Sequence, residues 1–332
     1  MLRLGDLRPK AFPNGAHATG LRALLDSLTS PSPTPGVDEA ALQRRLAVRN
    51  EQRLRPTLEE RFGPAEWEQE RVDRLLEEEF VARERAALGD QLARVPCEPD
   101  PFLAWFERLR ETGPGQNDEL FPWLAEEASL DQLRWFLGQE VAGEADFEDL
   151  LALTQLKMPV AAKLEMARNF WDEMGRGQET GMHGPLLARL AQDLDVRLPA
   201  DQILMEPLAL ANLMSALAWN RRYAFQSIGA LGVIELTAPG RAAMVNAGLR
   251  RLGCPPASRK YFALHATLDV QHALAWKEHV LRPLVAADPR CAVAFAEGAL
   301  MRLRAGERCF AAYRAHLNPA LGARVRPAAS HG

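Results

Sequence analysis

Cysteine is scarce in this sequence, and the cysteines are not paired. Only four occur among 332 residues, at Cys97, Cys254, Cys291 and Cys309, and none belongs to a CxxC motif. This spacing excludes a disulfide framework or a zinc ribbon as the basis of the fold. We therefore expect a chain that folds around a hydrophobic core in a reducing compartment, which predicts a cytoplasmic protein.

The chain also lacks an excess of positive charge and a long apolar run. It has 40 Lys and Arg against 44 Asp and Glu, a formal net charge of -4. No basic field is therefore expected to attract nucleic acid. We find no apolar run long enough to span a bilayer, and residues 1–12 carry charges where a secretory signal would be apolar. Neither a nucleic-acid nor a membrane partner is predicted.

Alternating β-branched residues are missing as well, so no sheet is expected. Apolar residues instead recur at helical spacing from residue 37 onward, which predicts an all-α fold. The helices that we expect lie at Glu59–Val95, Phe102–Glu111, Glu119–Ala128, Leu130–Gln155, Val160–Gly175, Met182–Leu194, Asp201–Tyr223, Phe225–Leu236, Gly240–Leu252, Ser258–Ala286, Arg290–Arg304 and Glu307–His316.

Composition divides the chain into four parts. Residues 1–36 are rich in Gly, Pro, Ser and Thr and predict a flexible leader. Residues 37–98 predict a helical extension whose dense Glu and Arg form a solvated helix face. Residues 99–317 predict the main helical bundle, and residues 318–332 a flexible tail.

Carboxylates interrupt the apolar faces of three expected helices. Glu140 and Glu144 lie on the face that carries Leu137, whereas Glu173 and Glu235 end the apolar faces of two later helices. Burial of a lone carboxylate is strongly unfavourable unless the group is paired or binds a metal ion. The pattern therefore predicts a shared cation.

The expected helix from Ser258 supplies nitrogen ligands. His265, Asp269 and His272 follow one another at offsets of four and three, which places them on one helical face. His183 follows Glu173 by ten residues, and the glycines between them allow the chain to bend back. Carboxylates and imidazoles on facing helices suit iron, with manganese as an alternative. The set has enough ligands for two metal ions.

Each of these residues also has a simpler explanation. A single Glu can be a surface charge or, at Glu235, the charge at a helix end, and His183 can begin a helix without binding anything. The combination of His265, Asp269 and His272 is the hardest to explain without a ligand.

Three segments resemble a known family in combination. They are the Arg168–Gly177 segment with Met182-His183, the Ile228–Pro239 segment, and the His-x3-Asp-x2-His motif of residues 265–272. Together they are similar to the haem-oxygenase-like di-iron oxidases, or iron-containing redox enzymes, over about Leu130 to Leu284. The resemblance implies a haem-oxygenase-like helical bundle without haem, which here carries an N-terminal helical extension. It also implies two iron ions and the use of dioxygen.

The resemblance implies a ligand set and a range of reactions. Glu140, Glu173 and Asp269 are expected to act in catalysis as metal ligands, and the complete metal set is Glu140, Glu173, His183, Glu235, His265, Asp269 and His272. The substrate would be a small amino-acid, amine or fatty-acid derivative that undergoes desaturation, C–C cleavage or N-oxygenation. Thr180 stands where some N-oxygenating members have a further Glu, and the adjacent Glu179 is not assumed to replace it.

Several alternatives stay open at this point. The chain could be a non-catalytic helical scaffold, or a haem-binding or cofactor-free member of the same fold. An external electron donor and a homodimer are further options. The expected apolar wall of the site consists of Phe136, Phe170, Met174, Leu231 and Leu268, and the candidate binders of a substrate carboxylate are Arg176, Arg221, Arg222 and Tyr223.

Overall fold

The computed structural model describes residues 38–58, 63–144 and 146–322, and these form α-helices joined by short connections. The helices are α2 (Glu39–Leu54), α3 (Pro64–Ala86), α4 (Pro99–Thr112), α5 (Leu120–Glu126), α6 (Leu130–Ala142), α7 (Phe147–Thr154), α8 (Val160–Glu173), α9 (His183–Asp193), α10 (Met205–Trp219), α11 (Ala224–Arg251), α12 (Lys260–Trp276), α13 (Arg282–Ala287), α14 (Arg290–Leu317) and α15 (Pro319–Gly322).

Short 3₁₀ and π turns connect several of these helices. They are η2 (Gly89–Arg94), η3 (Gly175–Gly177), η4 (Glu179–Gly181), η5 (Ala200–Gln202), η6 (Arg221–Tyr223) and the π-helical turn η7 (Lys277–Leu281). Within the described ranges no strand occurs, and the only β-type pairing is an isolated bridge between Met174 and Met182. The predicted all-α fold is confirmed.

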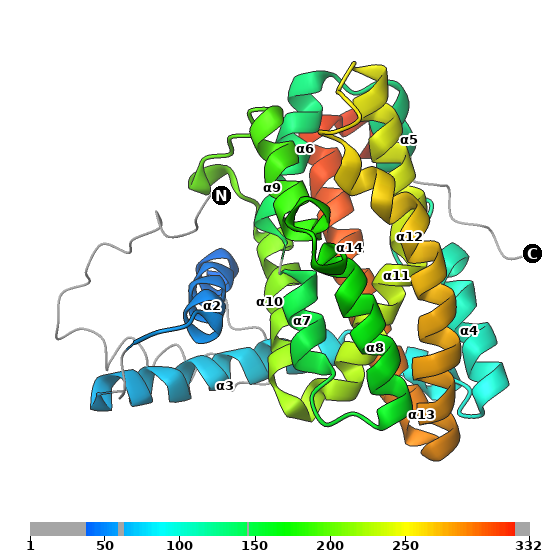
Figure 1. Cartoon of the computed structure of the whole chain (residues 1–332). Helices are drawn as coiled ribbons and strands as arrows, with labels where there is room; N and C mark the ends of the chain where they lie inside the picture. Colours follow the sequence, from blue (N-terminus) through cyan, green and yellow to red (C-terminus); the bar gives the residue numbers. More distant parts are fainter. Residues whose placement is uncertain (1–37, 59–62, 145, 323–332) are drawn as a thin grey trace, which may run out of the picture.

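Two long helices, α11 and α14, form the centre of the bundle (Figure 1). α11 packs mainly against α12, α14 and α5, while α10 packs against α14 and α2. A Cβ atom on Gly229 would lie 1.9 Å from the Phe295 carbonyl oxygen, and one on Gly298 would lie 1.8 Å from the Gln226 carbonyl oxygen. Glycine is therefore required on both helices, because their backbones are in direct contact.

The expected helix Leu130–Gln155 is wrong as a single element. α6 ends at Ala142, and α7 begins at Phe147 after Asp146, whose φ is +51°. Gly143 and Asp146 carry the ordinary signals for a helix end and a new helix start, and acidic Glu148 and Asp149 lie in the first turn of α7. After the break, Glu144, Phe147 and Leu150 still line the same cavity as Glu140.

Other helix boundaries also differ from the predictions. α11 continues through Pro239, so Phe225–Leu236 and Gly240–Leu252 form one helix although Pro239 cannot donate to the Glu235 carbonyl. α14 is likewise continuous where two helices were expected. The expected helix Ser258–Ala286 is instead α12, η7 and α13, because the chain widens into a π turn at Lys277. Tertiary packing outweighs the local breakers in the two long helices.

By length and composition, the segment Arg221–Arg251 could cross a membrane, so the prediction that no such run exists is wrong. Its most apolar window is 61% buried within the fold. A helix at the centre of a bundle can be equally apolar without a membrane, because neighbouring helices cover its faces.

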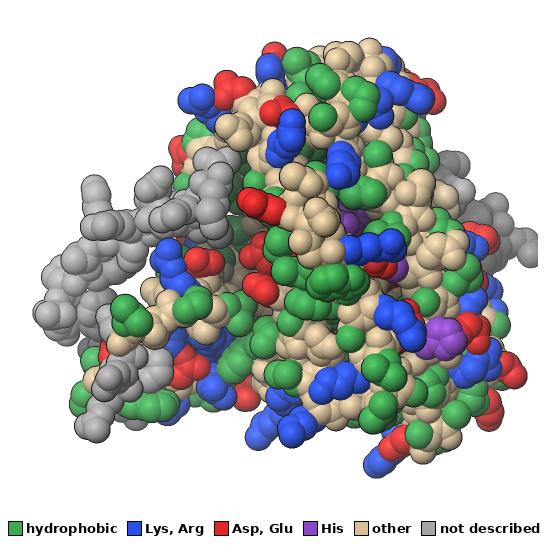
Figure 2. Space-filling view, viewed as in Figure 1, with side chains coloured by type: hydrophobic (Ala, Val, Ile, Leu, Met, Phe, Trp, Pro, Cys, Tyr) green, Lys and Arg blue, Asp and Glu red, His purple; other side chains and the backbone are tan. Residues whose placement is uncertain are grey.

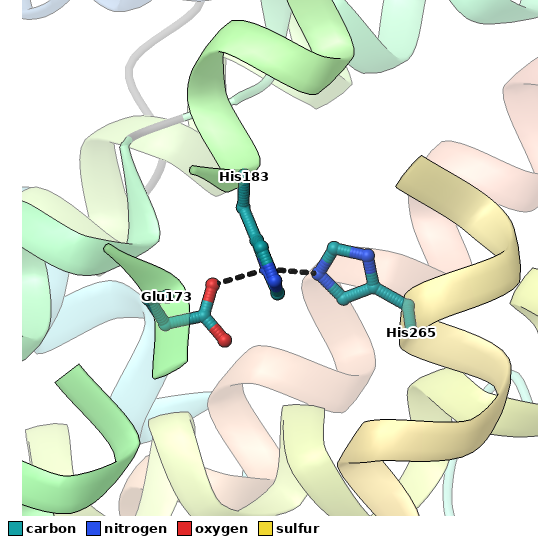
Figure 3. A group of neighbouring side chains, drawn as sticks. All are labelled: Glu173, His183 and His265. Carbon is teal, nitrogen blue, oxygen red and sulfur yellow. Dashed lines mark hydrogen bonds and ion pairs between the residues drawn. The ribbon is translucent and has the colours of Figure 1, made fainter. Parts of the chain in front are cut away.

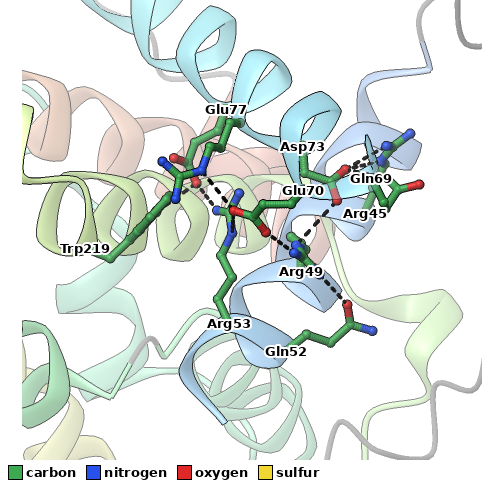
Figure 4. A network of polar contacts seen from close by, with 10 residues as sticks. Arg45, Arg49, Gln52, Arg53, Gln69, Glu70, Asp73, Glu77 and Trp219 are labelled. Carbon is green, nitrogen blue, oxygen red and sulfur yellow. Dashed lines mark hydrogen bonds and ion pairs between the residues drawn. The ribbon is translucent and has the colours of Figure 1, made fainter. Parts of the chain in front are cut away.

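The N-terminal extension, α2 and α3, lies along one side of the bundle (Figure 1). Arginines of α2 pair with acids of α3 in a half-buried network (Figure 4). Arg53 Nη1 lies 2.6 Å from Glu77 Oε2, and the Trp219 Nε1–H of α10 donates to the same oxygen at 3.0 Å. The Arg53 guanidinium also lies 4.3 Å from the centre of the Trp219 ring. Glu77 thus connects α2, α3 and the bundle.

A second buried contact holds α2 against the bundle. The Asn212 side-chain amide of α10 donates to the backbone carbonyl and the side-chain oxygen of Gln43, each at 2.8 Å, and accepts from Asn50 at 3.0 Å. These bonds are directional, so they fix the register of α2 on α10 where apolar packing alone would not.

The visible surface has no field of one sign. Acidic, basic and apolar side chains are interspersed over the face that Figure 2 shows. The predicted leader, residues 1–36, lies outside the described residues. Of the predicted tail, residues 318–322 are described and carry α15, whereas residues 323–332 are outside the described part.

Replacing Glu77 tests how firmly the extension is attached. Burial raises the pKa of Glu77 against the opposing effect of Arg53, so the network contributes little net stability while intact. Removing one partner is different, because the buried Arg53 would keep only its longer contact with Glu70 at 3.4 Å, and the Trp219 Nε1–H would lose its acceptor. We expect Glu77→Ala to lower the free energy of unfolding by about 3–5 kcal/mol. Urea denaturation and limited proteolysis of α2 measure the effect.

The half-exposed neighbour Glu78 provides the matched control. Glu78→Ala is expected to change stability by less than about 0.5 kcal/mol, as is usual for a surface substitution. Equal effects of the two variants would contradict the anchoring role of Glu77.

Candidate metal centre

A tight connection returns the chain from Glu173 to His183. Glu173 ends α8, the chain makes the two turns η3 and η4, and His183 begins α9. Gly175 has φ +61°, and a Cβ atom on it would lie 2.3 Å from the Gly181 backbone. Met174 and Met182 pair across the neck of this loop. The glycines therefore act as predicted, since only they allow the two arms to approach so closely.

Glu173, His183 and His265 form the first of two buried groups (Figure 3). His183 Nδ1 lies 2.5 Å from Glu173 Oε2 and 3.2 Å from His265 Nε2. His265 Nδ1 lies 2.9 Å from the Tyr261 carbonyl oxygen, to which it can only donate. His265 Nε2 is then left with a free lone pair that faces Glu173 and His183. Three electron-donating atoms thus converge on one position.

Glu173, Glu235 and His272 form the second group, so Glu173 belongs to both. His272 Nδ1 lies 3.4 Å from Glu235 Oε2. His272 Nε2 donates to Asp172 Oδ2 at 3.2 Å, which keeps Nδ1 directed at Glu235. The Asn169 side-chain amide donates to the other Glu235 oxygen at 2.5 Å. Asp172 and Asn169 orient the group, and the sequence reasoning missed both.

Asp269 lies next to the second group without a partner of its own. It is 2% exposed, its Oδ1 atom makes no hydrogen bond within the described part of the chain, and this atom lies 4.0 Å from His272 Nδ1. His272 Nδ1 is likewise buried and without a hydrogen bond. Burial, then Glu235 and Glu173, raises the pKa of Asp269 well above its ordinary value. Such a group needs either a proton or a cation.

The ionisable groups strongly perturb one another. Burial and the nearby Glu235 raise the pKa of Glu173 to about 8, and burial lowers the pKa of His183 to about 4. Burial alone would lower the pKa of His272, but the carboxylates of Glu235 and Asp172 raise it to about 9. Without a metal ion, the cluster must therefore hold protons at neutral pH.

Besides Asp269, Glu140 is the predicted ligand that lies in neither group. It lines the adjoining cavity, where burial raises its pKa against a hydrogen bond from the Tyr313 hydroxyl. Another acid, Glu148 of α7, lies near His183. It is 7% exposed, and a Cβ atom on Gly184, the next residue, would lie 3.0 Å from its Oε1. Its charge opposes the burial effect on the pKa of His183. The acidic first turn of α7 was the signal for Glu148.

A cavity of about 190 Å³ adjoins the acids and histidines. Apolar side chains make up much of its wall, among them Phe121, Phe136, Phe262 and Phe310. Of the five expected wall residues only Phe136 is among the described residues that line it, and Leu231 is instead fully buried in the core. The sequence could not show which helix faces converge here.

The expected carboxylate binders do not face this cavity. Arg176 is exposed and donates to Asp172 at 2.6 Å, and Arg221 donates to the carbonyl oxygens of residues 153, 154 and 156. Arg222 and Tyr223 are also absent from the described lining. Two arginines that the sequence reasoning missed, Arg241 and Arg302, line the cavity instead. Glu179 is exposed, so it does not extend the metal cluster.

The donor atoms fit a metal ion of the iron type. Two carboxylates and three imidazoles form the two groups, Asp269 lies beside them, and Asp269 and His272 each have a buried polar atom that makes no hydrogen bond. Mixed oxygen and imidazole donors suit iron or manganese, and no cysteine belongs to either group. The fold and the site thus define a helical bundle with a buried metal-binding cluster.

The chain belongs to the family of iron-containing redox enzymes, whose model matches residues 134–307. This match spans α6 to α14 and includes all seven predicted ligands. The fold is similar to the crystal structure of a CADD-like protein of unknown function from Nostoc punctiforme PCC 73102. The two share 18% sequence identity and a TM-score of 0.50, over 68% of this chain and 97% of that one. No curated protein matches this chain significantly.

The pKa values predict how the stability of the metal-free protein depends on pH. Glu173 and His272 have folded-state pKa values above their ordinary values, so the folded chain holds protons that the unfolded chain releases. Their stabilising contribution is therefore lost as pH rises. The lowered pKa of His183 makes stability rise with pH instead, but only between about pH 4 and pH 6.5. We expect the free energy of unfolding to fall from pH 6.5 to 8.

Glu173→Gln isolates the main contribution to this slope. Each excess proton contributes at most about 1.4 kcal/mol per pH unit, and the substitution should remove the share of Glu173. Urea denaturation in the presence of a chelator, at several pH values, measures both proteins. An unchanged slope in the variant would show that Glu173 does not hold the proton.

Asp172→Asn tests whether the Asp172 carboxylate orients His272. The variant is expected to bind Mn²⁺ or Fe²⁺ about 10–100-fold more weakly, as is typical when a carboxylate behind a ligand histidine is lost. Isothermal titration calorimetry measures the affinity. Glu179→Gln, on the exposed connecting loop, is the control and should bind as the wild type does.

Proposed function

We propose that this protein is a non-haem di-iron oxidase or oxygenase that uses dioxygen to oxidise a small organic substrate. The observation that carries the proposal is the position of Glu173, which belongs to both buried groups. A carboxylate has two oxygens, so one side chain can serve two metal ions. Family membership supports iron and redox chemistry.

The ligands divide between two metal positions. His183 and His265 would hold one ion and Glu235 and His272 the other, with Glu173 shared. Asp269 lies beside the second position and Glu148 beside His183, so each is a candidate for a further ligand. Glu140 is a poorer candidate because it accepts a hydrogen bond from Tyr313, and because the charges that act on it are those of Arg302 and Arg241. The metal pair, when bound, would supply the activation of dioxygen.

The remaining residues control the environment of the reaction. The phenyl rings of the cavity wall exclude water from the reacting bond and so limit side reactions. Asp269, held without a hydrogen bond on Oδ1, can accept a proton or move onto a metal ion without breaking another contact. Tyr261 lines the cavity and fixes His265 through its backbone carbonyl, while its hydroxyl has a raised pKa because of burial and Glu144. It stays protonated and can donate a hydrogen bond.

The alternatives explain fewer observations. A porphyrin is much larger than the cavity of about 190 Å³, and haem would leave the clustered acids without a role. A non-catalytic scaffold would not need a buried Asp269 without a partner. An external electron donor, a homodimer and a cytoplasmic location stay predictions, and manganese stays an alternative to iron.

The division of ligands can be tested by counting metal ions. After anaerobic loading with ferrous ion, we expect about two irons per wild-type chain. His183→Ala and His272→Ala should each retain about one, because each loses a ligand of a single group. Glu173→Ala should lose most of both, since it removes the shared ligand. Asp149→Ala, an exposed acid on α7, is the control and should retain two.

Dioxygen is then added to the loaded proteins, and its consumption is followed with an oxygen electrode. The wild type and Asp149→Ala should consume dioxygen, whereas Glu173→Ala should not. Iron below one ion per wild-type chain, or full loading without dioxygen consumption, would reject the proposed function.

A further inference from the structure

Two partly buried arginines face the same cavity as the metal cluster. Arg241 extends from α11 and Arg302 from α14, and both line the cavity together with Glu140. Along α11, Arg241 follows Glu235 by six residues, which corresponds to about 9 Å. The cavity therefore has acids and imidazoles at one end and guanidinium groups toward the other.

These arginines have few hydrogen-bond partners for cations that line a cavity. Arg241 donates only to neutral oxygens, Thr237 Oγ1 at 3.2 Å and Gln116 Oε1 at 3.4 Å, and lies 5.5 Å from the centre of the Phe310 ring. Arg302 Nε is buried and makes no hydrogen bond. Within the described ranges, no ion pair joins either guanidinium to a carboxylate. Glu140 is the nearby acid that acts on both, and it already accepts a hydrogen bond from Tyr313; Glu144, also in the lining, acts on Arg302.

The electrostatics of the pair point to a missing anion. Burial, together with the other arginine, lowers the pKa of Arg241 to about 9, and burial lowers the pKa of Arg302. Two cations side by side in a largely apolar wall are unfavourable unless an anion lies between them. Guanidinium groups match a carboxylate particularly well, since both are planar and can form two parallel hydrogen bonds.

We propose that Arg241 and Arg302 bind the carboxylate of a small organic acid, whose apolar body then extends toward Glu173, Glu235 and Asp269. The inference rests on the proposed function for the reaction, although the binding itself requires no metal. A cavity of about 150 Å³ holds a benzene ring, so about 190 Å³ suits an acid of the size of a single ring or a short alkyl chain. The proposal names small carboxylic acids as the substrate class.

Gly306 gives Arg302 the space that this role requires. A Cβ atom at Gly306 would lie 2.8 Å from Arg302 Nη1, so the missing side chain leaves room for the guanidinium on α14. The aromatic rings of Phe121 and Phe310 lie beside Arg241 and restrict its orientation. The orientation of the Arg241 guanidinium is thus restricted before a ligand arrives, which lowers the entropy cost of binding.

The test compares benzoate with its neutral analogue benzamide. Isothermal titration calorimetry is performed on the full chain in the metal-free state, for the wild type and for Arg302→Met. We expect benzoate to bind the wild type at least about 10-fold more tightly than benzamide does, since a charge-assisted pair is lost in the amide. Arg302→Met should weaken benzoate binding at least about 10-fold and leave benzamide binding unchanged.

Matched variants separate this role from a structural one. Arg304→Met removes an arginine from the same helix outside the cavity lining and should bind benzoate as the wild type does. Arg302→Lys keeps the charge and should recover part of the affinity. Near-ultraviolet circular dichroism confirms that each variant is folded. If Arg302→Met does not fold, Arg241→Met is expected to show the same selective loss of benzoate affinity.

Three outcomes would overturn the inference. In the first, the wild type binds benzoate and benzamide equally well. In the second, both Arg302→Met and Arg241→Met bind benzoate as the wild type does. In the third, inorganic phosphate binds more tightly than benzoate. Benzoate binding that appears only after metal loading would also overturn it, because the carboxylate would then bind the metal ions. The titration uses metal-free protein, so a chain that binds benzoate through Arg302 but takes up no iron would reject the proposed function alone.

Discussion

The electrostatic cost of the buried acids is the constraint on which the site depends. Ligand atoms of Glu173 and Glu235 lie within 4.8 Å of each other, and both acids act on the neighbouring Asp269. Glu173 and Asp269 have raised pKa values because water is excluded and the charges repel. Hydrogen bonds from Asn169 and the histidines offset part of this cost, but the Oδ1 atom of Asp269 is left without a donor. Metal ions would satisfy all of the acids at once. The apo fold therefore stores an unfavourable charge arrangement that metal binding relieves.

The bundle can carry this cost because other elements fix the site on several sides. α11 and α14 meet through glycine backbones, α12 supplies three site residues from one face, and the Gly175–Gly181 loop holds Glu173 and His183 together. The extension α2–α3 adds a second polar network on the far side of α10. Stabilising contacts are thus distributed over the chain, whereas the destabilising ones are concentrated at the cavity.

Local patterns predicted the parts of the site that are local in sequence. The offsets of His265, Asp269 and His272 placed them on one face, and the glycines after Glu173 predicted the return of His183; the structure brings all four to the same cavity region. Whether each binds a metal ion stays a prediction. Fold class could be predicted because helical spacing recurs along the whole chain.

The predictions failed where contacts between helices determine the helix boundaries and the residues of the site. The break at Gly143–Asp146 separates Glu140 from Glu148, and reading one continuous helix hid the second acid. Pro239 suggested a helix end, but packing on both sides keeps α11 continuous. Arg241 and Arg302 lie far apart in the sequence, so no spacing rule could relate them. Only the convergence of α11 and α14 shows that they share a cavity.

The glycine contact between α11 and α14 also bears on how this cavity could be altered. α11 carries both Glu235 and Arg241, and α14 carries Arg302, so the backbone contact at Gly229 and Gly298 fixes the two ends of the cavity relative to each other. Because this contact is made by backbone atoms, repacking of side chains cannot increase the distance between the two ends. An enzyme engineered for longer molecules would have to open the aromatic wall and leave the helix pair unchanged.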